Sequence, residues 1–136
     1  MISFFYETEF KIKDPKTWER KIEYLIDEEG FEIGEINYIF CDDEYLLKIN
    51  QEYLQHDYYT DVIGFQYTYE SPLMGDIYIS IERIKENAKK NDVSFENELA
   101  RVMIHGVLHF VGFKDKTPED TIKMREAENK YLTLFI

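Results

Sequence analysis

The sequence predicts an α+β fold in which a mixed sheet of about four strands packs with four or five helices in one domain, residues 1–136. Three observations support it. The chain has 136 residues, 44% of them hydrophobic, which is typical of one domain with one core. Segments with the two-residue period of strands alternate with segments of helical period. No repeat or low-complexity linker divides the chain, so its elements are expected to share one core.

The chain begins with a predicted strand and a predicted helix. Aromatic residues alternate along residues 2–12, which indicates a strand. Asp14 and Pro15 then suit the N-cap and first position of a helix that runs to about Glu29, where Gly30 stops it. The apolar residues of this helix recur every three or four positions, as in helices that cover a sheet: Trp18, Ile22, Leu25 and Ile26.

A second strand is expected at residues 36–41, followed by a second helix. Asp42 or Asp43 can be the N-cap of that helix, and a polar loop at residues 55–59 ends it. Its spacing predicts four core-facing residues, Tyr45, Leu46, Ile49 and Tyr53.

Two further strands are expected at residues 62–67 and 76–81. The intervening segment, residues 69–75, holds the proline and glycine of a connection. A short helix is expected at residues 84–90.

Two longer helices complete the predicted fold. Ser94 begins the first of them. Thr117, Pro118 and Asp120 have the spacing of a capping box and predict a last helix that runs almost to Ile136.

Two histidines four residues apart, in a chain with only three, predict a metal site. His105 and His109 project from one helical face, so both imidazoles can reach one ion. Gly112 can adopt the left-handed conformation that ends a helix and lets Asp115 return to the same ion. Three protein ligands leave a position open, as in catalytic sites. Histidine pairs also occur on solvated helix faces and in cores, but the scarcity of other histidines favours metal.

One residue of this motif excludes a protease of the usual zinc type. Such enzymes carry a glutamate directly after the first histidine as the general base. Here that position is Gly106, which offers no base.

Composition limits the partners and the compartment. The net charge of −12 repels polyanions, so non-specific nucleic-acid binding is not predicted. Glu7 and Glu9 interrupt the apolar start of the chain, and no stretch approaches twenty apolar residues, so we expect a cytoplasmic protein without a membrane partner. The single cysteine, Cys41, agrees with a reducing compartment. Basic residues cluster locally, either as solvated helix faces or as a functional patch: Lys11, Lys13, Lys16, Arg20 and Lys21, then Arg83, Lys85, Lys89 and Lys90.

Three separated segments give the chain a resemblance to the YbeY family of bacterial rRNA maturation factors. They are INQEYL and TDVIGF within residues 49–65, MGDIYIS at 74–80 and HGVLHFVGF at 105–113. Their order and spacing also match, so the likeness covers about residues 36–115. The resemblance implies a metal-dependent endoribonuclease that processes the 3′ end of 16S rRNA and takes part in ribosome quality control. The implied catalytic residues, acting through water activated by one ion, are His105, His109 and Asp115.

Two departures from the family pattern concern the site. The usual third ligand is a histidine where this chain has Asp115, and Lys114 stands where aspartate is common. As a basic side chain that could stabilise charge on a phosphate, Lys114 is a further catalytic candidate. Zn²⁺ is the expected ion, with manganese, iron or nickel as alternatives. Leu54 follows Tyr53 where the family has an arginine, and leucine cannot bind a phosphate. Five basic residues could replace that arginine: Arg83, Arg101, Lys114, Lys116 or His56. Three residues match family positions and could serve catalysis, strand-edge hydrogen bonding or turn capping: Asp57, Thr60 and Asp61.

Two other functions also fit the sequence. The chain could be a non-catalytic ribosome-assembly factor that binds ribosomal proteins or an assembly GTPase, since an acidic protein is attracted to basic partners. It could also be a metallohydrolase of a small substrate. The leading expectation is a monomer that acts on rRNA within the small ribosomal subunit.

Overall fold

The computed structural model describes residues 1–135, which form four strands and five helices. In chain order these are β1 (Ile2–Tyr6), α1 (Pro15–Glu28), β2 (Ile33–Cys41), α2 (Asp43–Leu54), β3 (Val62–Gln66), β4 (Leu73–Ser80), α3 (Ile81–Lys90), α4 (Phe95–Phe110) and α5 (Pro118–Phe135). The predicted α+β class is confirmed. The predicted domain limits stay a prediction, because Ile136 lies outside the described residues.

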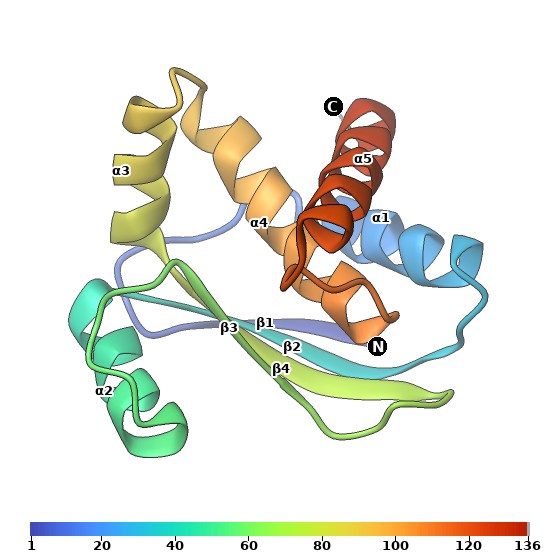
Figure 1. Cartoon of the computed structure of the whole chain (residues 1–136), viewed down its shortest axis with the longest axis horizontal. Helices are drawn as coiled ribbons and strands as arrows, with labels where there is room; N and C mark the ends of the chain where they lie inside the picture. The colour runs from blue at the N-terminus through green and yellow to red at the C-terminus, as the bar shows by residue number, and fades with distance from the viewer. Residues whose placement is uncertain (136) are drawn as a thin grey trace.

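The sheet is mixed and has the strand order β1-β2-β4-β3. β1 and β4 both run parallel to β2, whereas β3 is antiparallel to β4 and forms one edge. Helices α1, α4 and α5 lie on one side of the sheet, with α3 beside α4, and α2 lies on the other side (Figure 1). The main core lies on the side of the sheet that carries α1, α3, α4 and α5. A small cluster of Cys41, Leu46 and Ile63 lies between the sheet and α2 on the other side.

The prediction of a first strand over residues 2–12 is wrong beyond Tyr6. Tyr6 pairs with Phe40, and the backbone N–H of Glu7 donates to the carbonyl oxygen of Phe40 over 2.7 Å. Because β2 ends at Cys41, the following residues find no neighbouring strand and form an irregular segment up to α1.

Three other predicted limits are corrected by strand pairing and capping. β2 begins at Ile33 instead of residue 36, because Ile33 pairs with Leu73 across a bulge. For the same reason β4 begins at Leu73 instead of residue 76, so part of the expected connection at 69–75 belongs to this strand. α3 begins at Ile81, three residues earlier than expected, because the Ser80 side chain caps it by accepting from the N–H of Arg83.

The predicted helix caps are mostly confirmed. Asp42, not Asp43, caps α2 by accepting from the N–H of Tyr45, and the Ser94 hydroxyl caps α4. Thr117 Oγ1 accepts from the N–H of Asp120 over 3.0 Å at the start of α5. Asp14 occupies the N-cap position of α1, but its backbone is left-handed and its side chain makes no capping hydrogen bond.

Two glycines allow α4 to lie directly against the sheet. A Cβ atom on Gly75 would lie 2.6 Å from the Phe110 ring and 2.7 Å from the carbonyl oxygen of Phe65, and one on Gly106 would lie 3.0 Å from Ile77. All three distances are shorter than ordinary van der Waals contact. A glycine at position 106 therefore lets α4 pack against Ile77, and it also leaves the position after His105 without a general base.

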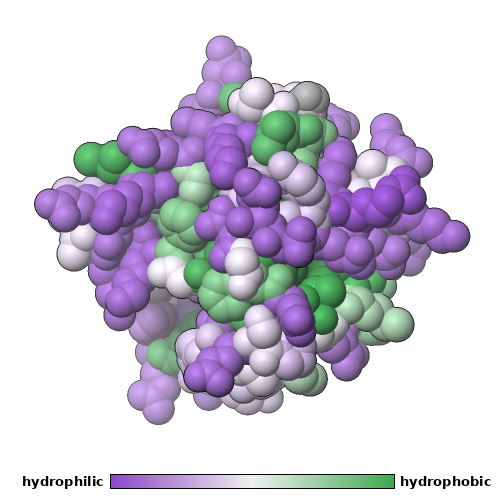
Figure 2. Space-filling model, turned by 90° about the vertical axis from the view of Figure 1, so that its right-hand side faces the viewer, coloured by the Kyte–Doolittle hydropathy of each residue, from purple (hydrophilic) through white to green (hydrophobic). Residues whose placement is uncertain are grey.

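The outer surface is largely hydrophilic on one face (Figure 2). On the face that Figure 2 shows, hydrophilic residues cover most of the surface and hydrophobic residues form small patches between them. Among residues 1–135, none of the helices combines the length and the apolar character needed to span a bilayer.

Candidate metal centre

Helix α4 holds both histidines of the predicted site on its one incompletely buried side. The other sides of the helix are packed into the core by Val102, Met103, Ile104, Val107 and Leu108. The side chains of His105 and His109 keep 22% and 37% exposure. Because the buried residues fix the rotation of the helix, the two imidazoles must face the same open side.

The end of α4 brings Asp115 back to these imidazoles. Gly112 has φ +108°, and its N–H donates to the carbonyl oxygen of His109 over 3.1 Å. The side chain of Gln66 on β3 also donates to the carbonyl oxygen of Phe110 over 2.8 Å. The predicted role of Gly112 is confirmed, because only a left-handed residue lets the chain reverse here.

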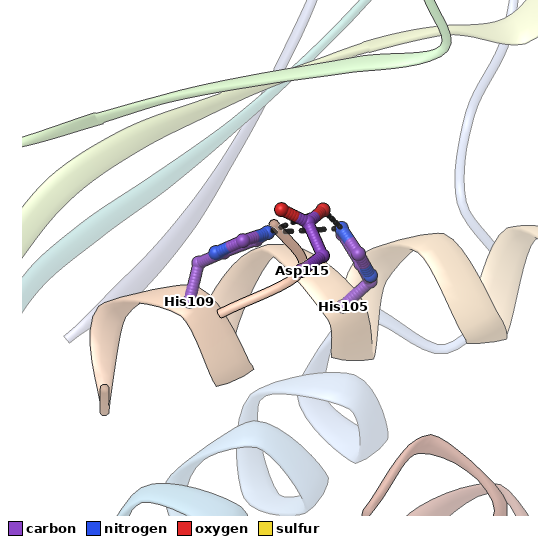
Figure 3. A group of neighbouring side chains, drawn as sticks. All are labelled: His105, His109 and Asp115. Carbon is purple, nitrogen blue, oxygen red and sulfur yellow. Dashed lines mark hydrogen bonds and ion pairs between the residues drawn. The ribbon is translucent and has the colours of Figure 1, made fainter. Parts of the chain in front are cut away.

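The three predicted ligands converge on one point (Figure 3). His105 Nε2 lies 3.1 Å from His109 Nε2 and 3.6 Å from Asp115 Oδ2, and His109 Nε2 lies 3.2 Å from the same oxygen. Ligand atoms at 2.0–2.1 Å around a tetrahedral ion are separated by about 3.3 Å. The triangle therefore has the dimensions of one face of such a site.

The donor set also fits a metal. Two imidazole nitrogens and one carboxylate oxygen are ligands for first-row divalent ions. All three atoms can offer a lone pair, and at these distances they share either a proton in a hydrogen bond or a cation. Three protein ligands leave room for water or substrate, as in catalytic zinc sites.

Behind His105 lies a carboxylate that the sequence analysis did not identify. Glu128 of α5 is 5% exposed, and its Oε2 lies 2.7 Å from His105 Nδ1. Burial alone would raise the pKa of Glu128, but hydrogen bonds from His105 and Arg101 outweigh burial and lower the pKa below its usual value. The sequence does contain a signal for this residue. Glu128 is a charged residue between Met124 and Leu132 in the apolar stripe of α5, where an apolar side chain would be expected.

A cleft of about 540 Å³ opens in front of the three ligands. Its walls come from the end of α2, the following loop, β3 and α4, and all three histidines of the chain line it. Leu54, at the family arginine position, lines it as well and is 40% exposed. This cleft is large enough for a ligand that reaches the triad from outside.

Four of the five basic residues considered as replacements for that arginine lie elsewhere. Arg83 binds Asp43 over 3.1 Å, and Arg101 binds Glu128 over 2.9 Å. Lys114 is exposed and lies in a separate hollow beside Lys123, while Lys116 is exposed and does not line the cleft. The catalytic role of Lys114 stays a prediction.

His56 is the replacement candidate that does line the cleft. Its ring stacks on Tyr58 with centroids 5.1 Å apart, and its Nδ1 lies 3.0 Å from the Tyr58 hydroxyl. Within the described chain, no lysine or arginine is among the residues that line this cleft. Among the described residues that line the cleft, histidine is therefore the only type of side chain that can be cationic.

The three remaining family positions lie in different surroundings. Thr60 and Asp61 line the cleft, whereas Asp57 is exposed and accepts from Gln51 Nε2 over 2.6 Å. Burial raises the pKa of Asp61, and the nearby His105 offsets this only in part. A carboxylate held in the wall of a cleft at a cost in solvation is typical of functional sites.

Replacing Asp61 with asparagine is expected to stabilise the metal-free protein at neutral pH. A carboxyl group whose pKa is raised by folding binds its proton more tightly in the folded chain, so stability is lost as pH rises through that raised pKa. Asparagine keeps an acceptor oxygen without the charge. Thermal unfolding with a chelator present should give a higher midpoint for Asp61→Asn at pH 7, and the difference should shrink below about pH 3. An equal or lower midpoint at pH 7 would show that burial does not strain this carboxylate.

Comparison of the chain with a family model and with curated relatives matches the same family in both cases. The family model described as Endoribonuclease YbeY matches residues 4–135. Curated relatives with the name Endoribonuclease YbeY, from Flavobacterium psychrophilum and Flavobacterium johnsoniae, are 54% and 50% identical over 135 residues. These matches cover 99% of this chain and 96% and 97% of the relatives. The solution structure of a Thermotoga maritima protein covers 99% of this chain and 89% of its own, with a TM-score of 0.69 and 28% identity.

Proposed function

Since this chain belongs to the YbeY endoribonuclease family, we propose that it is a metal-dependent hydrolase that cleaves RNA phosphodiester bonds in the cleft in front of His105, His109 and Asp115. The observation that carries the proposal is the position of the triad, whose three donor atoms face one another at the wall of an open cleft. The names of the relatives support RNA as the substrate class.

The ion in this proposal is Zn²⁺, and manganese, iron or nickel would accept the same donors. His105, His109 and Asp115 would hold it. A divalent ion bound there would supply Lewis acid chemistry and would make water more acidic. The negative charge of Asp115 lowers the net charge of the site relative to three neutral imidazoles, so water should become less acidic than at a three-histidine site.

The chain's own residues have distinct tasks in this cleft. His56, held against Tyr58, would contact the phosphate in place of the absent arginine. Leu54 cannot hydrogen-bond and would only exclude water from that wall. Asp61 could accept or release a proton near the scissile bond, since burial raises the pKa of its carboxyl group. Lys114 would have to reorient before it could contact a phosphate bound here.

The particular substrate in this proposal is rRNA of the small ribosomal subunit, cut near the 3′ end of 16S rRNA in the cytoplasm by a monomer. A role in ribosome quality control belongs to the same proposal. Its support is the resemblance of the three sequence segments to rRNA maturation factors, together with the family match.

Cleavage of a precursor RNA tests this function. Zinc-loaded protein should cut small-subunit rRNA that carries its 3′ extension, and His109→Ala should lose this activity because one metal ligand is gone. For metal content the matched control is His56→Ala, which removes an imidazole from the same cleft but not from the triad, and should retain metal. If fully loaded native protein leaves both precursor rRNA and assembled small subunits uncut, the nuclease proposal is wrong.

A non-catalytic assembly factor is the second candidate, and the charge of the chain favours it. The net charge is −12, and neither lysine nor arginine lines the cleft within the described residues. An acidic surface attracts basic ribosomal proteins or an assembly GTPase more readily than bare RNA. Co-sedimentation with small subunits that survives His109→Ala, without RNA cleavage by the native protein, would support this function. Hydrolysis of a small phosphodiester alone would point to a small-substrate metallohydrolase.

A further inference from the structure

The imidazole of His105 is held from both sides. Its Nε2 faces the other two ligands, at 3.1 Å from His109 Nε2 and 3.6 Å from Asp115 Oδ2. Its Nδ1 lies 2.7 Å from Glu128 Oε2 on the opposite side of the ring. The same histidine therefore joins the candidate metal centre on α4 to a buried carboxylate on α5.

Glu128 is itself held in place by cations. Arg101 Nη1 donates to its Oε1 over 2.9 Å, and Arg125 Nη1 lies 3.4 Å from the same oxygen. Arg101 Nη2 also donates to Asn129 Oδ1 over 3.0 Å, which fixes the guanidinium against α5. With 5% exposure, Glu128 has little access to water, so these partners determine its orientation.

This arrangement selects one tautomer of His105. An ionised carboxylate only accepts hydrogen bonds, so the proton of a neutral imidazole must be on Nδ1 when Glu128 is its partner. The lone pair is then on Nε2, the nitrogen that faces His109 and Asp115. A metal ion requires that lone pair, and hydrogen-bonded carboxylates behind ligating histidines strengthen metal binding.

We propose that Glu128 is a positioning residue of the metal centre, which holds His105 in the tautomer and orientation needed to bind the ion, while Arg101 holds Glu128. The inference rests on the proposed function only in that the triad binds a metal. It adds α5 to the site and gives the Arg101–Glu128 pair a task beyond joining two helices. Loss of such a partner typically weakens metal binding by about 10- to 100-fold.

The first test uses the native protein. Nitrogen-15 NMR of metal-free protein, at a pH at which the ring is neutral, should show His105 protonated on Nδ1. A ring protonated mainly on Nε2 would overturn the proposal, because Glu128 would then not be the acceptor. This measurement requires neither a variant nor RNA.

The second test compares two variants of the same charge. Glu128→Gln keeps the shape of the side chain but removes its charge, and zinc affinity measured against a competing chelator should fall by about 10- to 100-fold. The His105 spectrum should also lose its single tautomer. Glu126→Gln removes an exposed carboxylate from the same helix and should leave both readouts unchanged.

The outcomes separate this inference from the nuclease proposal. Unchanged zinc affinity and tautomer in folded Glu128→Gln would mean that Glu128 serves packing alone. The expected tautomer and affinity loss, combined with uncut RNA, would leave Glu128 as a positioning residue and reject the nuclease function instead. If Glu128→Gln does not fold, the spectrum of the native protein still decides the question.

Discussion

An Asp115→Ala variant is expected to fold normally and to lose its metal and its RNA cleavage together. The Asp115 side chain is 46% exposed, so its removal leaves no core cavity. Its oxygen is one of the three candidate ligand atoms that converge, and two imidazoles alone would hold a divalent ion much more weakly. Because a complete four-ligand zinc site is worth about 10–16 kcal/mol, one ligand accounts for roughly a 100- to 1000-fold loss in affinity. Metal content after dialysis should fall from about one equivalent to less than about a tenth.

The Asp115→His variant is the matched comparison. Histidine supplies a different donor at the same position and restores the ligand that the family usually carries there. Metal should be retained in Asp115→His and lost in Asp115→Ala, while an exposed aspartate on α1, changed in Asp27→Ala, should have no effect. Full metal retention in folded Asp115→Ala would remove Asp115 from the ligand set.

A Gly75→Ala variant is expected to lose much stability from a single added methyl group. Its Cβ would lie 2.6 Å from the Phe110 ring and 2.7 Å from the carbonyl oxygen of Phe65 on the paired strand. Neither neighbour can move freely, since Phe110 is 4% exposed and Phe65 is part of the β3–β4 ladder. Such overpacking costs about 3 kcal/mol, which lowers the unfolding midpoint by roughly 10 °C in a chain of this size.

The same substitution at Gly64 gives a graded control. A Cβ atom there would lie 3.1 Å from the Phe110 ring, and no backbone atom lies closer. Urea unfolding should therefore place Gly64→Ala between the native protein and Gly75→Ala. Because Phe110 is the residue after His109, the Gly75→Ala protein should also bind zinc more weakly. Equal stability of the Gly75→Ala and native proteins would mean that α4 does not pack this closely on the sheet.

Local rules predicted most of the elements correctly, because most of their signals lie within a few residues. The caps at Asp42, Ser94 and Thr117 each join residues three positions apart, so local sequence was enough to predict them. The errors in strand limits occurred where strand pairing decides a boundary. Tyr6 is the last residue of β1 because of where β2 ends, and nothing within residues 2–12 contains that information. Elsewhere, α3 begins earlier because Ser80 caps it, and the predicted core-facing residues Tyr45 and Tyr53 of α2 are exposed.

In the candidate site, too, some features follow from local sequence and others from tertiary packing. By itself the sequence determined that His105 and His109 share a helical face and that Gly112 can return Asp115 to them, because helical geometry and a left-handed turn are local properties. Only the tertiary structure decided that Glu128 lies behind His105 and that His56 enters the cleft. These contacts join segments 23 or more residues apart, and their formation depends on how α5 and the loop after α2 pack onto α4, which local periodicity does not encode.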